Sequence, residues 1–264
     1  MMAFSPVQWM GRALARFLSR ERPQEISTAT TRPDLLFDAL EPGDVLLVEG
    51  TSRISGAIKY LTQSTWSHAA LYVGDAIDGD SLSSERRSLV EADLNDGVRA
   101  VPLGLYAHYH TRICRPVGLT PAENEQVIRY AIERLGHQYD LRNIFDLARY
   151  LIRNPPVPGH LKRRMLTFGS GDPTRAICSS LIAQAFQSIR YPILPAIDYL
   201  EPAAHHPPGY LREIYRIRHH SMYAPRDFDV SPFFDVVKPR VVDGFNFRAF
   251  DWFEDEGSDT SAEH

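Results

Sequence analysis

Residues 67–74 read Ser-His-Ala-Ala-Leu-Tyr-Val-Gly, an apolar run that contains one histidine and ends at a glycine. An apolar run of this length, closed by Gly74-Asp75, predicts a buried β-strand. Short runs rich in Val, Ile and Leu predict four more strands, at 45–48, 88–92, 98–101 and 112–116. Because turns such as Asn95-Asp96-Gly97 separate these strands, the pattern favours an antiparallel sheet of about five or six strands.

Helical patterns follow the strands. Thr120-Pro121-Ala122-Glu123 combines a capping box with proline at the first helical position, so a helix is predicted to begin there and to end at Gly136. Other helices are predicted at 52–62, at 142–152 and from Cys178 through Phe186. Together these patterns predict an α+β fold in which the Cys178 helix packs across the antiparallel sheet.

The chain divides into three parts by pattern. Residues 1–33 predict an amphipathic helix with a polar linker, residues 34–215 carry the main domain, and residues 216–264 predict an aromatic C-terminal wrap with an acidic tail. Within the main domain, the prolines of residues 191–209 predict an irregular crossing, and residues 210–215 predict a returning strand or helix.

The composition is that of a globular protein. The 264 residues are 44% hydrophobic and carry a net charge of −4, which excludes collagen-like and wholly disordered chains and gives no footprint for nucleic acid. Two cysteines and the absence of a secretory signal or an apolar membrane span indicate a cytoplasmic protein. No metal-ligand spacing or phosphate-binding glycine loop occurs, so neither a metal nor a cofactor is expected. The oligomeric state is not indicated.

The N-terminal segment has the pattern of an amphipathic helix. Apolar side chains recur every three or four residues in 4–18, and Arg12, Arg16 and Arg20 line another face. This combination is typical of a helix that lies on a membrane surface. The same apolar stripe also fits packing against the core of this chain or against a second subunit, and the sequence leaves both interpretations open.

Cys178 is the sharpest candidate for chemistry. It stands where a loop containing Gly169, Gly171 and Pro173 enters an apolar helix. The free amides and the dipole of a helix N-terminus favour a thiolate over a thiol, which makes the side chain a nucleophile. The alternative interpretation is a buried cysteine that packs as a small hydrophobic residue.

His68 and Glu91 are the candidate partners of this nucleophile. Each is a polar residue in an otherwise apolar strand, and a buried carboxylate needs a partner such as an imidazolium. A base and a carboxylate that orients it would complete a nucleophile–base–orienter set with Cys178. A lone strand histidine also fits a hydrogen-bonded core residue, so the combination of the three residues carries the hypothesis.

Other candidates are weaker. Ser179 and Ser180 stand beside a better nucleophile, and Cys114 on its strand is expected to fill the core. The paired histidines of residues 108–110, 205–206 and 219–220 lack an acidic or cysteine partner at the spacing of a closed zinc site.

Several of these segments resemble the permuted papain-like amidases of the NlpC-type cysteine hydrolase superfamily. The resemblance is carried by residues 40–47, 67–74, 90–92 with Gly97-Val98, and 177–181, together with Tyr139-Asp140. It implies a circularly permuted papain-like fold over residues 38–215, in which the histidine strand precedes the cysteine helix. It also implies that Cys178 is the nucleophile, His68 the base and Glu91 the orienting carboxylate.

The resemblance implies a cysteine hydrolase that acts on an amide or ester bond. The substrate is then a peptide amide or an acyl lipid, and acyl transfer is an alternative reaction because related folds move acyl chains between lipids. A different alternative is a non-enzymatic scaffold on the same fold, with residues 4–18 as its docking element on a membrane or a protein.

Overall fold

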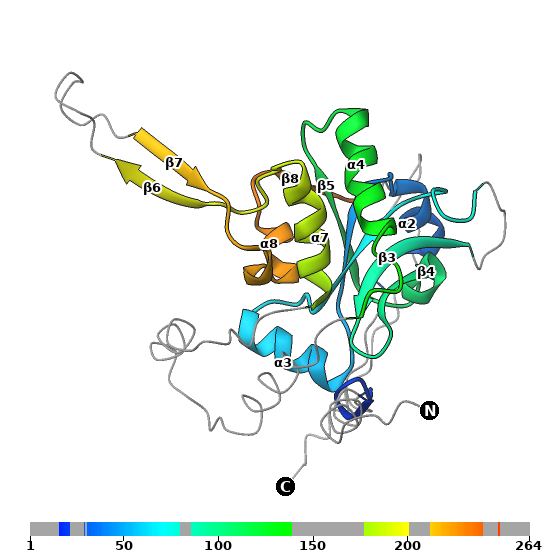
Figure 1. The fold of residues 1–264 in the computed structure, drawn as a ribbon. Coiled ribbons are helices and arrows are strands. Elements are labelled where there is room, and N and C mark those ends of the chain that lie inside the picture. Colours follow the sequence, from blue (N-terminus) through cyan, green and yellow to red (C-terminus); the bar gives the residue numbers. More distant parts are fainter. Residues whose placement is uncertain are drawn as a thin grey trace, which may run out of the picture.

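A six-stranded antiparallel sheet forms the centre of the protein (Figure 1). The computed structural model describes residues 16–21, 29, 31–79, 86–138, 177–200, 212–239 and 248. The strands lie in the order β4-β3-β2-β1-β5-β8. Their bounds are β1 Val45–Val48, β2 His68–Tyr72, β3 Arg87–Asp93, β4 Gly97–Pro102, β5 Thr111–Pro116 and β8 Phe234–Val237. The predicted α+β class with an antiparallel sheet is confirmed, and β8 is a strand that the sequence patterns did not predict.

Helices cover both faces of this sheet. Their bounds are α2 Pro33–Ala39, α3 Arg53–Thr62, η1 Leu103–Tyr106, α4 Pro121–Ile132, α7 Ile177–Ser188, η2 His220–Met222 and α8 Pro225–Asp229. The period of two along β1 explains the arrangement: Val45 and Leu47 pack with α4 and α7, whereas Leu46 and Val48 pack with α2 and η1. The sheet is therefore buried on both faces, and each face has its own core.

Local signals in the sequence fix several element ends. Thr120 and Glu123 form the predicted capping box at the start of α4. Gly97, in the hairpin between β3 and β4, has φ +74°, and a Cβ at this position would lie 2.4 Å from the carbonyl oxygen of His137. Only glycine fits this turn without displacing the neighbouring backbone.

The prediction of an irregular crossing is wrong at residues 196–200. Strand β6, Ala196–Leu200, pairs antiparallel with β7, Arg212–Arg216, and the two form a separate hairpin that extends away from the main sheet (Figure 1). Of the prolines that suggested an irregular segment, Pro192 and Pro195 stand before β6, and none lies within it, so they remove no hydrogen bond from its ladder.

The C-terminal wrap completes the central fold. Strand β8 pairs with β5, and the buried side chains of Phe228 and Phe234 join the core beside α7. Residues 225–237 thus belong to the same body as the strands before them. The predicted helix at 142–152 and the Tyr139-Asp140 pair lie outside the described residues.

Only the end of the N-terminal helix is described, with residues 16–18 helical. Leu18 is buried, whereas Phe17 is 46% exposed with the Arg53 guanidinium 4.3 Å from its ring centre. The backbone N–H of Arg53 donates to the Arg20 carbonyl. The end of the helix therefore packs on this protein's own body, and the rest of the apolar stripe of residues 4–18 lies outside the described residues. No helix within the described part of the chain has the length and apolar character to cross a membrane.

Candidate active site

His68 and Glu91 lie on one face of two neighbouring strands. The β2–β3 register pairs Leu71 with Val90, which places Glu91 beside Ala70 and on the same face as His68. The His68 Nε2 atom lies 2.8 Å from Oε2 of Glu91. The Glu91 side chain is 1% exposed and that of His68 is 22% exposed. The carboxylate is thus held in the protein interior, and the imidazole at its edge.

Two further side chains hold the Glu91 carboxylate. Arg99 is directly opposite Glu91 in the β3–β4 ladder, and its Nε donates to Oε1 at 2.9 Å. The hydroxyl of Tyr106, on η1, donates to Oε2. Burial alone would raise the pKa of Glu91, but the charge and hydrogen bond of His68, with Tyr106 and Arg99, lower it to about 2. Glu91 is therefore a carboxylate at any physiological pH.

Cys178 lies in the first turn of α7 and contacts the same imidazole. Its side chain is hydrogen-bonded to His68, and the residue is only 5% exposed. Because Glu91 engages Nε2, the other ring nitrogen, Nδ1, is left for the sulfur. Helix α7 packs on the opposite face of the sheet from Glu91. His68 and Cys178 are still in contact because both lie at the ends of their elements. His68 is the first residue of β2, and Cys178 is the second residue of α7.

The electrostatic environment keeps the imidazole protonated. Burial opposes a charge on His68, but the negative charges of Glu91 and Cys178, with the hydrogen bonds to both, raise the pKa of His68 well above its ordinary value. The ring then donates a proton to Glu91 on one side and faces the sulfur on the other. A cysteine sulfur beside a protonated imidazole is the arrangement from which cysteine hydrolases attack a carbonyl.

The competing candidates occupy structural positions. Cys114 is fully buried in β5, as expected, and burial raises its pKa to about 12. The hydroxyl of buried Ser179 donates to the Tyr223 carbonyl. His110 pairs with Glu49 at 3.0 Å. Across the described segments, no group of three or more His, Cys, Asp or Glu side chains has the arrangement of a metal site.

Arg99 and Tyr106 are site residues that the sequence interpretation missed. A signal for Arg99 was present: the hairpin turn at Asn95-Asp96-Gly97 fixes a register in which residue 99 faces residue 91. An arginine opposite a buried glutamate is the pairing that such a register predicts. Tyr106 lies on a short 3-10 helix after β4, and no periodicity indicates which way its side chain turns.

Part of the chain matches a known protein family, and two known proteins are similar to it. Residues 39–150 match the family described as permuted papain-like amidase enzyme, YaeF/YiiX, C92 family. The probable lipoprotein peptidase YaeF of Escherichia coli strain K12 is 24% identical over 190 residues, which cover 66% of this chain and 63% of YaeF. The chain thus spans less than two thirds of that relative's length. The crystal structure of the metalloprotein YiiX from Escherichia coli O157:H7 is similar with a TM-score of 0.43 and 17% identity, over 76% of this chain and 98% of YiiX.

The matched range bears directly on the site. It contains His68, Glu91, Arg99 and Tyr106, and it ends before α7, so the position of Cys178 is known from the structure and not from the match. The resemblance noted in the sequence is confirmed by this match: residues 39–150 are similar to the permuted papain-like amidases, a peptidase-like class of hydrolases.

Proposed function

We propose that this protein is a cysteine amidase that hydrolyses a peptide-type amide bond, with Cys178 as nucleophile, His68 as general acid and base, and Glu91 as the residue that orients the imidazole. The observation that carries the proposal is the unbroken series of contacts from Cys178 to His68 to Glu91. Three residues from α7, β2 and β3 meet in the order that nucleophilic catalysis requires.

The reaction follows from these contacts in two steps. The Cys178 thiolate attacks the carbonyl carbon and forms a C–S bond, and the His68 imidazolium gives its proton to the amide nitrogen as the C–N bond breaks and the amine leaves. Neutral His68 then takes a proton from water, the hydroxide attacks the thioester, and the thiolate departs with its electron pair. In this mechanism the backbone N–H groups at the start of α7 would stabilise the oxyanion of each intermediate.

The family match favours an amide substrate over an acyl lipid. The matching family is one of amidases, and the relative YaeF is named as a probable lipoprotein peptidase. A protonated imidazole beside the sulfur also suits an amine leaving group, which must receive a proton before it departs. Acyl-lipid hydrolysis and acyl transfer use the same thioester intermediate and are distinguished by the product that appears.

Alkylation tests the nucleophile before any substrate is known. With iodoacetamide near pH 7, we expect Cys178 to react at least about 100-fold faster than buried Cys114, as peptide mapping by mass spectrometry would show. The substitution His68→Ala should remove this advantage, whereas His219→Ala, at an exposed histidine, should leave it intact. Equal reactivity of the two cysteines would contradict the proposal.

Product analysis then tests the reaction. Peptide mixtures and lipid extracts would be incubated with the wild-type protein and with Cys178→Ala, and new amines, carboxylates or acyl esters identified. New peptide termini that depend on Cys178 support the amidase. Released fatty acids or newly acylated lipids would overturn the amide assignment in favour of acyl-lipid chemistry.

A further inference from the structure

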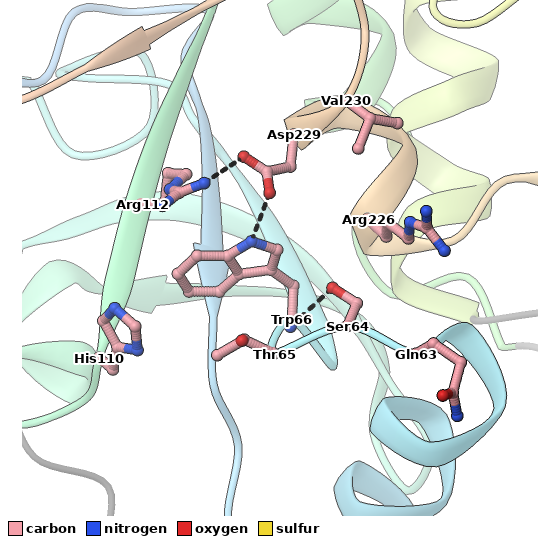
Figure 2. A pocket seen from close by; sticks show the side chains of 9 residues that line it. All are labelled: Gln63, Ser64, Thr65, Trp66, His110, Arg112, Arg226, Asp229 and Val230. Carbon is pink, nitrogen blue, oxygen red and sulfur yellow. Dashed lines mark hydrogen bonds and ion pairs between the residues drawn. The ribbon is translucent and has the colours of Figure 1, made fainter.

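A pocket lies on the α7 face of the sheet, at the end of the sheet that carries His68. It is lined mainly by polar and charged side chains, which come from the segment between α3 and β2, from the start of β5 and from α8 with the residue after it. Figure 2 shows them around the central Trp66. The ladder places Arg112 opposite Leu47 and Leu47 opposite Ala69, and Leu47 belongs to the core beneath α7. The pocket is therefore on the same face as the helix that carries Cys178.

One wall of the pocket is a closed hydrogen-bonded unit. Asp229 accepts from Arg112 Nη1 at 2.6 Å through Oδ1 and from Trp66 Nε1 at 3.0 Å through Oδ2. The Arg112 guanidinium also lies 5.1 Å from the Trp66 ring centre. The Asp229 charge is thus compensated by Arg112, and both carboxylate oxygens are engaged. This unit fixes the wall without adding net charge.

Arg226 supplies the positive charge that remains. It lies across the pocket from the Arg112–Asp229 pair (Figure 2). Its Nη1 donates to the Thr62 carbonyl at 2.8 Å, a neutral acceptor at the end of α3. Within the described ranges it forms no ion pair with a carboxylate, so most of its five N–H donors are available to a ligand. The pocket is therefore locally positive in a chain of net charge −4.

The distance to the catalytic residues suits a substrate that occupies both sites. Val48 pairs with His68 on one side and with Thr111 on the other, so the start of β5 lies two strand spacings, or about 10 Å, from His68. About three residues of an extended peptide cover this length. The pocket holds about 260 Å³, just below the ~300 Å³ at which whole-ligand pockets begin, so it fits one end of a substrate.

We propose that this pocket is a substrate subsite in which Arg226 binds an anionic oxygen group, a carboxylate or a phosphate, on the substrate that Cys178 attacks. The inference rests on the proposed hydrolase. It assigns the substrate a negative charge on one side of the reacting carbonyl. A planar guanidinium binds both oxygen groups through paired N–H donors, so the experiment distinguishes them.

Alkylating reagents of matched length test the subsite. The reagents are 6-(iodoacetamido)hexanoate, its uncharged hexanamide counterpart, and 4-(iodoacetamido)butyl phosphate. In each case the Cys178 sulfur forms a bond to the CH₂ carbon as the C–I bond breaks and iodide leaves. We expect an anionic reagent to label Cys178 about tenfold faster than the hexanamide, as a charge-assisted contact predicts. The faster of the two anionic reagents identifies the group.

Variants separate the charge of Arg226 from its contact with Thr62. In Arg226→Gln the rate advantage of the anionic reagent should fall to about one, whereas Arg129→Gln, at an exposed arginine on α4, should keep it. Glutamine retains an N–H donor for the Thr62 carbonyl. A purely structural role for Arg226 would slow the charged and uncharged reagents alike, and that result, or equal rates in the wild type, overturns the subsite.

Direct binding separates this inference from the proposed function. Calorimetric titration of Cys178→Ala with sodium hexanoate and with inorganic phosphate needs no catalysis, and Arg226→Gln should weaken the tighter interaction about tenfold. If this difference is present while Cys178 is unreactive, the subsite stands and the hydrolase fails. Fast labelling by iodoacetamide with no effect of Arg226 on either measurement overturns the subsite alone.

Discussion

Glu91→Gln is the substitution that tests the site most directly. Glutamine keeps the size of the side chain but removes the negative charge that faces the imidazolium of His68 and the guanidinium of Arg99. In the folded protein the pKa of Glu91 is lowered from 4.5 to about 2. At ~1.4 kcal/mol per pKa unit this difference corresponds to about 3 kcal/mol of stability. The side chain is 1% exposed, so solvent screens little of it.

The pH range of this contribution follows from the direction of the change. Glu91 is ionised in the folded protein above pH 2 but in the unfolded chain only above about 4.5, so the unfolded state takes up the proton first as the pH falls. The stabilisation is complete above pH 4.5 and is lost as the pH falls towards 2. Glu91→Gln should therefore unfold about 3 kcal/mol more easily at pH 7, and the difference from wild type should shrink between pH 4.5 and 2.

Urea unfolding at a series of pH values measures this difference. The matched control is Glu125→Gln, at an exposed carboxylate on α4, which should follow the wild type throughout. A second readout is the pH profile of hydrolysis. Loss of the carboxylate charge lowers the pKa of His68, so the alkaline limb should move to lower pH in Glu91→Gln. A constant stability difference at all pH values, together with an unmoved limb, would refute the reasoning.

Two further predictions concern the surroundings of the site. Tyr106→Phe removes one donor to Glu91 and leaves the ring packed, so we expect a loss of about 1–3 kcal/mol in unfolding free energy. Because Glu91 keeps its charge in this variant, the alkaline limb should not move to lower pH as it does in Glu91→Gln. An unfolding free energy equal to that of wild type would contradict the role of the Tyr106 hydroxyl. Deletion of residues 1–20 should weaken salt-sensitive binding to anionic phosphatidylserine vesicles while Cys178 keeps its reactivity with iodoacetamide. Vesicle binding that survives the deletion, with a lower unfolding midpoint from the loss of buried Leu18, would make the segment structural.

The strands of the central sheet were predictable because each carries its own local signal. Residues 69–73 and 45–48 are apolar, and burial on both faces requires this of β2 and β1. Two strands were not predicted, and each for a physical reason. Strand β8 is short and lies at the sheet edge, with Asp235 and Val236 exposed, so its pattern resembles a loop. Strand β6 follows two prolines that dominate the local pattern, and its stability comes from its partner β7, which lies beyond residue 210.

The site residues that could be predicted from the sequence are those whose burial could be predicted. Glu91 and His68 stand out because they interrupt apolar strands, and their shared face follows from the period of two once the strands are paired. Arg226 has no such signal, since an arginine in a short C-terminal helix looks like any solvated surface residue. Its position across from Arg112 depends on the fold, which brings the segment between α3 and β2 and the start of β5 to the same pocket.

The burial of Glu91 bears on the purpose of the network that holds it. A buried ion pair is a poor means of stabilising a fold, because desolvation offsets most of the attraction, and well-packed apolar side chains would serve as well. Yet Glu91 lies in the interior with three donors from His68, Arg99 and Tyr106 directed at its two oxygens. A carboxylate fixed in this way cannot take the proton of the imidazole, since its pKa of about 2 lies far below that of His68. The imidazole of His68 therefore stays protonated, and in the proposed amidase the proton on the side that faces Cys178 is the one available to an amine leaving group.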